Sequence, residues 1–288
     1  MLLYGSFLCV QLGGIGVRIG RSKIVSDPIV QVLELVAQYG DLRVLEGVSF
    51  EIPNGSVTVI AGSSGCGKTT LLRHMIGLLK PTAGRILLRG EDIVAMSERE
   101  LSRIRTRQGV LFQGAGLLNS LTLADNVALP LREHTELRES TIEIMTRMKL
   151  ELVGLLGFEN FLPSQISGGM RKRAGLARAI AMDPEILYFD EPTAGLDPVT
   201  SAEIDELILK LKRTFRMTIV AVTHELPSIK NIADWVVMLD QGKVVFFGTL
   251  QEILACEDPT VRRFLDRQPG EVVYDSQRYI EAITGTNP

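Results

Sequence analysis

The sequence predicts an α/β fold that combines a parallel core sheet, an antiparallel edge sheet and a helical subdomain. Two short continuous apolar runs, at 186–189 and 218–222, are typical of parallel strands that are covered on both faces. Apolar residues that alternate with polar ones over 48–52 predict an antiparallel strand. Residues 97–163 are instead rich in Leu, Arg, Glu and Met at helical spacing.

The first elements follow from apolar patterning and turn residues. The apolar run 29–36 and the alternating segment 48–52 predict two antiparallel strands, and the second stops at a Pro-Asn-Gly turn. Residues 57–61 predict a short buried strand. Residues 70–79 then predict a helix that ends before Pro81, because proline cannot continue a helix.

The later elements return to strand–helix alternation after the helical subdomain, which begins near Gln113. Residues 202–212 predict the helix between the two buried strands, and a hairpin is predicted around an Asp-Gln-Gly turn at 240–242. The sequence predicts three parts. Residues 1–27 form a poorly ordered extension, residues 28–256 form the α/β domain with its helical subdomain at about 97–165, and residues 257–288 form a tail. The tail carries Tyr274 and Tyr279. It is either a disordered end or a segment that docks on a second copy or an accessory subunit, and we favour docking because aromatic residues are atypical of pure disorder.

Composition excludes several classes of protein. The 288 residues carry a net charge of −3, which disfavours direct binding to nucleic acid or to an anionic membrane surface. The three cysteines show neither a disulfide framework nor metal-ligand spacing, which indicates a reducing compartment. The apolar stretch 1–17 has no basic residues before it, so we interpret it as an extension or a misassigned start rather than a signal peptide.

A phosphate-binding motif links a predicted strand to a predicted helix. Gly62-Ser63-Ser64-Gly65-Cys66-Gly67-Lys68-Thr69 matches G-x-x-x-x-G-K-[ST] in full. Backbone N–H groups of such a loop surround phosphate oxygens, and the start of the following helix adds partial positive charge. Lys68 is placed for the β- and γ-phosphates and Thr69 for Mg²⁺. We interpret Cys66 as a small residue that fits the loop rather than as a redox sensor.

Two carboxylates end the buried run 186–189. Asp190 is placed to hold Mg²⁺, and Glu191 is placed to orient or deprotonate an attacking water. Earlier in the chain, Ser167-Gly168-Gly169 precedes a helical stretch, and a basic triplet at 171–173 follows it. We interpret this triplet as a helix face beside the nucleotide or a partner, in preference to a lipid-headgroup site.

The order of these motifs resembles that of the nucleotide-binding subunits of ABC transporters from residue 29 to about residue 254. The resemblance implies catalytic roles for Lys68, Gln113, Glu191 and His224, and Mg²⁺ ligands at Thr69, Gln113 and Asp190. It implies that the nucleotide is contacted by Tyr39, Gly62, Ser63, Ser64, Gly65, Cys66, Gly67, Lys68, Thr69, Thr70, Ser167, Gly168 and Gly169. ATP and Mg²⁺ are therefore the expected ligands.

The sequence departs from the usual family pattern in the Ser-Gly-Gly loop. Met170 stands where glutamine is usual, and methionine cannot donate the hydrogen bonds of an amide. This variant resembles the ATPases of MCE-linked lipid transporters, of the Mla type, which move phospholipids between the inner and outer membranes. Segments 126–134, 190–198 and 258–265 resemble the same subfamily.

The resemblance also implies a set of partners and a location. These are a head-to-tail homodimer with two shared ATP sites, a separate integral-membrane permease, an MCE-domain substrate-binding subunit and a small accessory subunit. The chain would then lie on the cytoplasmic side of a bacterial inner membrane and reach it only through the permease. The alternatives are another importer or exporter, for amino acids, metals or lipoproteins, a non-transport ABC ATPase, or a regulatory nucleotide-binding module without turnover.

Overall fold

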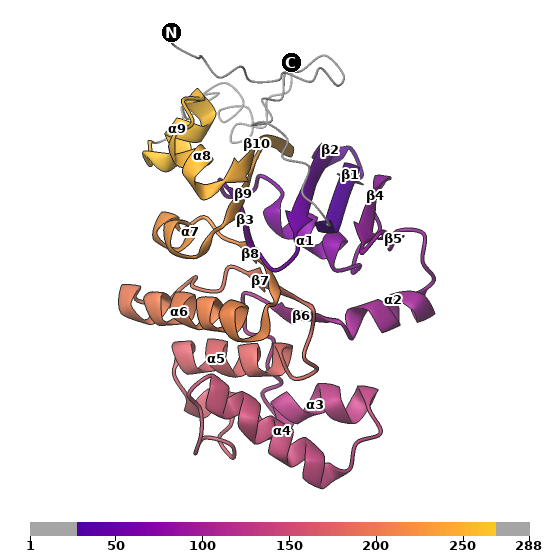
Figure 1. Cartoon of the computed structure of the whole chain (residues 1–288), viewed down its shortest axis with the longest axis vertical. Coiled ribbons are helices and arrows are strands. Elements are labelled where there is room, and N and C mark those ends of the chain that lie inside the picture. The colour runs from indigo at the N-terminus through magenta and orange to yellow at the C-terminus, as the bar shows by residue number, and fades with distance from the viewer. Residues whose placement is uncertain (1–27, 269–288) are drawn as a thin grey trace, which may run out of the picture.

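A computed structural model describes residues 28–268 of the chain (Figure 1). Our interpretation of 1–27 and of the tail beyond residue 268 lies outside the described residues. Within 28–268, the strands form one antiparallel and one mainly parallel sheet, which confirms the predicted fold class. The antiparallel sheet has the order β2-β1-β4-β5 and contains β1 (Pro28–Tyr39), β2 (Leu42–Pro53), β4 (Ala83–Leu88) and β5 (Glu91–Asp92).

The core sheet has the order β10-β9-β3-β8-β7-β6, in which only β10 runs antiparallel to its neighbour. Its strands are β3 (Val57–Gly62), β6 (Gln108–Leu111), β7 (Ile186–Asp190), β8 (Thr218–Val222), β9 (Trp235–Asp240) and β10 (Lys243–Thr249). The buried strands predicted at 57–61, 186–189 and 218–222 and the hairpin around 240–242 are all present.

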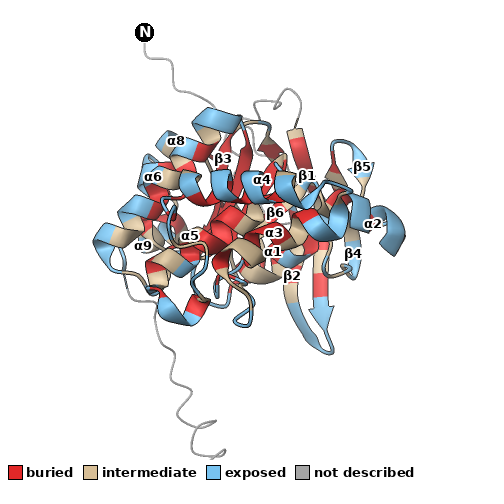
Figure 2. Cartoon of the chain, turned by 90° about the horizontal axis from the view of Figure 1, so that it is seen from below, coloured by how far each residue is buried: buried red, intermediate tan, exposed pale blue. Residues whose placement is uncertain are grey.

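Both faces of the core sheet are buried, which explains why its central strands are apolar without interruption. In β7, Leu187 and Phe189 pack in one hydrophobic cluster, whereas Ile186 and Tyr188 pack in the other. Successive strand residues point to opposite faces, so a sheet covered on both sides needs an apolar residue at every position. Figure 2 shows this burial concentrated in the strands, with exposed residues on the outer sides of α2 and α4.

The helices divide between the two faces of the core sheet. They are α1 (Lys68–Met75), α2 (Glu98–Arg105), α3 (Leu123–His134), α4 (Glu139–Leu152), α5 (Gly168–Ala179), α6 (Pro198–Phe215), α7 (Leu226–Ile232), α8 (Leu250–Leu254) and α9 (Pro259–Leu265). One cluster packs α1, α2 and the antiparallel sheet against one face. The other packs the remaining helices on the opposite face.

The region predicted as helical from about 97 to 165 differs from that expectation at its start. Residues 108–111 form β6, which pairs in parallel with β7, and α2 packs into the core cluster beside α1. The mainly helical part is therefore α3 and α4, which lie with α5 at the end of the molecule away from the antiparallel sheet (Figure 1). A four-residue strand with a glycine and a glutamine gives too weak a period-2 pattern to be recognised.

The bounds of helix α1 and the structure of the predicted tail also differ from the predictions. Helix α1 begins at Lys68 and ends at Met75, before the predicted end at 79, because Gly77 adopts a φ of 71°. The N–H groups of Gly77 and Leu78 bond to the carbonyls of His74 and Arg73, as in a Schellman C-cap. Helix α9 lies within the predicted tail, where its Val261 is buried in the core cluster.

Candidate active site

Three loops of the candidate site leave the same edge of the core sheet. Strands β3, β8 and β7 are adjacent and parallel, so their carboxyl ends lie together. The phosphate loop (residues 62–69) follows β3, Glu191 follows β7, and His224 follows β8 by two residues. Parallel topology therefore gathers groups that are far apart in the sequence, at the edge where open α/β sheets bind ligands.

The phosphate loop depends on glycine at two positions. Gly62 has a φ of 146°, and a Cβ there would lie 2.2 Å from the carbonyl oxygen of Leu239. Gly67 caps α1 with a φ of 105°, and a Cβ there would lie 2.7 Å from Cδ2 of Leu45. Ser63, Ser64 and Gly65 between them are exposed. The loop thus presents an open turn of backbone at the N-terminus of α1, the arrangement that binds phosphate.

The Lys68 side chain lies back along this loop. Its Nζ donates to the carbonyl oxygens of Gly62, at 2.9 Å, and Ser63, at 2.7 Å. A third contact, from Nζ to Sγ of Cys66, is 4.0 Å long. An ammonium held by neutral groups such as these can also bind an anion in the loop. Burial raises the pKa of the neighbouring Cys66 thiol, against the opposing effect of Lys68. A thiol that is kept protonated is a poor redox sensor, in agreement with our interpretation of Cys66.

The side-chain oxygens of Thr69 and Asp190 lie together at the start of α1 and the end of β7. The Thr69 hydroxyl donates to Oδ1 of Asp190 at 3.0 Å. Burial raises the pKa of Asp190, and the bond from Thr69 opposes that shift. Among the described residues no three His, Cys, Asp or Glu side chains gather as metal ligands. One carboxylate and one hydroxyl nevertheless suit Mg²⁺, which binds few protein oxygens and takes the rest from water and phosphate.

Glu191 and His224 meet across the ends of β7 and β8. Nδ1 of His224 donates to Oε1 of Glu191 at 2.8 Å. The histidine side chain is 54% exposed and that of the glutamate 19%. Glu191 has a positive φ of 49°, which is uncommon for a residue with a side chain. The carboxylate is therefore fixed in direction at the mouth of the site.

Gln113 lies in the exposed loop that follows β6, here called the Gln113 loop (residues 112–116). Its carbonyl oxygen accepts a bond from Nζ of Lys172, which also donates to the carbonyl oxygen of Glu191 at 3.1 Å. Burial lowers the pKa of Lys172, and the carboxylates of Asp190 and Glu191 act in the opposite direction. The sequence interpretation of the basic triplet as a helix face beside the nucleotide or a partner did not single out this residue, because lysine alone gives no signal of burial.

The Ser-Gly-Gly loop (residues 167–169) is not brought to the phosphate loop of its own chain. Ser167 caps α5 by accepting a bond from the N–H of Met170 at 3.2 Å, and it is exposed. Helix α5 packs on the face of the core sheet opposite to α1. Tyr39, at the end of β1, is 49% exposed. The Ser-Gly-Gly loop therefore lies outside the group formed by the β3, β7 and β8 loops, and Gln113 lies in the neighbouring loop that follows β6.

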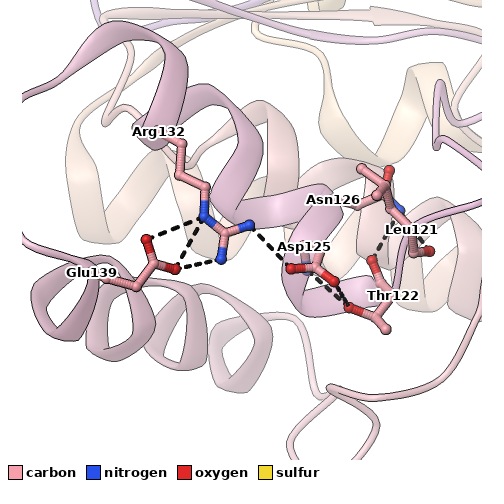
Figure 3. Close-up of polar contacts among 6 residues, drawn as sticks. All are labelled: Leu121, Thr122, Asp125, Asn126, Arg132 and Glu139. Carbon is pink, nitrogen blue, oxygen red and sulfur yellow. Dashed lines mark hydrogen bonds and ion pairs between the residues drawn. The ribbon is translucent and has the colours of Figure 1, made fainter.

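A separate cavity of about 780 Å³ lies between α3, α4 and the loop around residue 157. Asp125 and Glu139, which line it, both bind Arg132, and the buried Asn126 bonds to the backbone at the start of α3 (Figure 3). None of the predicted site residues lines this cavity.

Within residues 28–268 no helix is both long and apolar enough to cross a bilayer.

Comparison with known proteins gives one family. Residues 45–194 match the family model described as "ABC transporter". The chain is 40% identical to the "intermembrane phospholipid transport system ATP-binding protein MlaF" of Haemophilus influenzae, over 90% of this chain and 99% of that protein. It is 44% identical to the protein of the same name from Escherichia coli K12, over 79% of this chain and 84% of that protein.

Other relatives carry a different name. The chain is 46% identical to the "probable ribonucleotide transport ATP-binding protein mkl" of Mycobacterium leprae, over 86% of this chain and 71% of that protein. It spans only 66% of the protein of that name from Mycobacterium tuberculosis. Among solved structures, a dimeric ATP-binding cassette in a post-hydrolysis state, bound to ADP and Pi, is 30% identical with a TM-score of 0.71, over 77% of this chain.

Proposed function

The chain belongs to the ABC transporter family, and from this premise we propose that it hydrolyses ATP to drive phospholipid transport between the inner and outer membranes of a bacterium. The observation that carries the proposal is its 40% identity with an MlaF protein that it covers almost completely, at 99%. Maintenance of lipid asymmetry in the outer membrane is the corresponding cellular role.

The phosphate loop supplies the nucleotide site. In this proposal, backbone N–H groups of residues 62–69 and Nζ of Lys68 bind the β- and γ-phosphates, while Thr70 lies in the first turn of α1 beside them. Tyr39 offers an exposed aromatic ring that can stack on adenine. Thr69 and Asp190 would hold Mg²⁺, with Gln113 as a further ligand, and the ion would neutralise phosphate charge during transfer.

Glu191 is the group proposed to act on the attacking water. Its carboxylate is oriented by Nδ1 of His224 and lies beside the Asp190 that ends β7. A carboxylate at this place accepts a hydrogen bond from water and directs the oxygen toward the γ-phosphorus, and it can take the proton. His224 holds that carboxylate in position and presents its ring near the γ-phosphate.

Two copies of the chain are proposed to share two nucleotides. In the Ser-Gly-Gly loop, Ser167 is exposed, Gly168 is half-buried and Gly169 is buried, and the loop lies at the N-terminus of α5, whose first N–H groups have no intrahelical partner. It would bind the γ-phosphate held by the phosphate loop of the second copy, and a two-fold axis makes both sites alike. ATP would favour the closed dimer. A shift of the ratio of closed to open dimer from 1:99 to 99:1 requires that ATP bind the closed form more tightly by about 5.5 kcal/mol in total, to which two bound ATP molecules contribute.

A small groove beside the Gln113 loop is the proposed docking place of the permease. It has a volume of about 120 Å³ and is lined by Ile76, Leu78, Arg105, Gln108, Val110 and Phe112. Leu78 and Phe112 are exposed, and the Gln108 amide is buried without a partner among the described residues. An MCE-domain subunit and a small accessory subunit complete the proposed complex, at the cytoplasmic face of the inner membrane.

A second candidate function is transport of ribonucleotides, which the names of the mycobacterial relatives favour. One experiment separates the two. The tagged chain is purified from detergent-solubilised membranes, its partners are identified by mass spectrometry, its lipids and nucleotides are extracted, and its ATPase rate is measured. Co-purified phospholipid with a permease and an MCE-domain protein supports the proposal. Absence of ATP hydrolysis, or a ribonucleotide cargo, would overturn it.

A further inference from the structure

Lys172 joins three segments that meet at the candidate site. The side chain is 6% exposed and extends from the second turn of α5. Its Nζ donates to the carbonyl oxygens of Gln113 and of Glu191, the second at 3.1 Å. Both acceptors are backbone atoms, so this contact fixes the course of the two loops rather than any one side chain.

The rest of α5 lies against the same loop. Gly175 has no side chain, and a Cβ there would lie 2.5 Å from the carbonyl oxygen of Ala115. Arg178 donates to the carbonyl oxygen of Gly116. Lys172, Gly175 and Arg178 are spaced by three residues, so they share one face of the helix. The helix and the Gln113 loop are therefore in contact along residues 113–116.

Glu191 needs external support for its backbone. A φ of 49° costs energy for a residue with a side chain and persists only where the surroundings enforce it. Its N–H donates to the carbonyl oxygen of Val222 at 2.9 Å, and its own carbonyl accepts from Lys172. These two bonds hold the peptide groups on either side of its Cα, and so they set the direction in which the carboxylate leaves the chain.

We propose that Lys172 is a positioning residue for ATP hydrolysis, which holds the backbone of Gln113 and Glu191 at a fixed place relative to α5. The inference rests on the proposed function. Helix α5 begins at the Ser-Gly-Gly loop, which would meet the nucleotide of the second copy. Lys172 lies one turn further along and so passes a displacement of α5 to the two loops of its own chain that surround the attacking water.

The test compares two buried lysines. Lys172→Met removes the donor but keeps the length of the side chain, whereas Lys149→Met is the matched control. Lys149 is 8% exposed and pairs with Asp183, outside the candidate site. We expect Lys172→Met to lower kcat at least tenfold with KM for ATP within about twofold of wild type, because no group that holds the phosphates is altered. Lys149→Met should keep kcat.

A third variant separates positioning from general destabilisation. Lys172→Arg retains N–H donors and a charge, and we expect it to recover part of the kcat that Lys172→Met loses. Thermal unfolding is measured for all three proteins, and ATP affinity with a fluorescent ATP analogue. Equal kcat in Lys172→Met and wild type would overturn the inference and leave the ATPase function standing. An equal loss of kcat in Lys149→Met, or a rise in KM of Lys172→Met with kcat unchanged, would also overturn it. A wild-type protein that binds ATP without turnover would overturn both.

Discussion

Nδ1 of His224 lies 2.8 Å from Oε1 of Glu191, between the carboxyl ends of the adjacent parallel strands β8 and β7. The two residues are held there by different means, Glu191 by its left-handed backbone and His224 by the position of the β8 end. Their contact gives the proposed catalytic carboxylate one defined orientation.

Glu191→Gln should stop ATP turnover while ATP binding persists. The amide keeps the size of the side chain but cannot take a proton, so we expect kcat to fall at least about 100-fold. The closed dimer should accumulate with ATP, as measured by size-exclusion chromatography. Glu206→Gln, an exposed change on α6, is the control and should behave as wild type. Normal hydrolysis by Glu191→Gln would exclude Glu191 from the catalytic role.

Lys68→Ala should weaken ATP binding because it removes the ammonium that the phosphate loop holds at its centre. We expect Kd for ATP to rise about tenfold or more, which corresponds to at least about 1.4 kcal/mol. Isothermal titration calorimetry measures the change. Lys210→Ala removes an exposed lysine of α6 and should leave Kd unaltered. Unchanged affinity in Lys68→Ala would contradict the assignment of the loop.

A cross-link should show that the Ser-Gly-Gly loop faces the phosphate loop of a second copy. Ser64 and Ser167 are both exposed, and each can be replaced by cysteine in a chain whose Cys9 and Cys256 are serine. With Glu191→Gln and ATP present, a short bis-maleimide should give a covalent dimer on a denaturing gel. The single variant Ser167→Cys is the control, because any covalent dimer that it gives must be linked through Cys66. Cross-linking confined to single chains would argue against a shared site.

His74 should make the fold sensitive to acid. Burial lowers its pKa below the ordinary 6.5, and its Nδ1 donates to the carbonyl oxygen of Leu79 at 2.9 Å. Near and below pH 6.5 the unfolded chain therefore takes up a proton more readily than the folded chain does, so stability falls as the pH falls through that value. His74→Asn keeps a donor near Nδ1 and cannot titrate. Urea unfolding at pH 7.5 and 5.5 (about one pH unit on either side) should show a smaller loss for this variant than for wild type. An equal loss would contradict the prediction.

Asn126 should stabilise the start of α3. Its side chain is fully buried, accepts a bond from the N–H of Leu118 at 2.7 Å, and donates to the carbonyl oxygens of Leu118, Leu121 and Thr122. Asn126→Ala removes these four bonds, and although backbone N–H groups still bond to the carbonyls of Leu118 and Thr122, it leaves the Leu118 N–H without this acceptor, so we expect a loss of about 1–3 kcal/mol in the free energy of unfolding. Urea unfolding measures it, with the exposed Asn160→Ala as control. A loss no larger than that of the control would contradict this role.

The fold class and the candidate site could be predicted to different depths. The parallel strands were recognisable because burial on both faces demands continuous apolar runs, as in β7 and β8. Strand β6 escaped recognition because four residues with one glycine carry little pattern, and the ends of α1 depended on the backbone of Gly77. The roles of the predicted site residues remain predictions that the experiments above test.

The sequence by itself determined the order of the motifs, since the phosphate loop, the Asp190-Glu191 pair and His224 are each recognisable from side-chain type and position. Only the tertiary structure decided how these motifs meet. It pairs Glu191 with His224, places Ser167 on the opposite face of the core sheet from α1, and buries Lys172 against the carbonyls of Gln113 and Glu191. Carbonyl groups are the same in every residue, so a contact that depends on them leaves no mark in the sequence until the chain is folded.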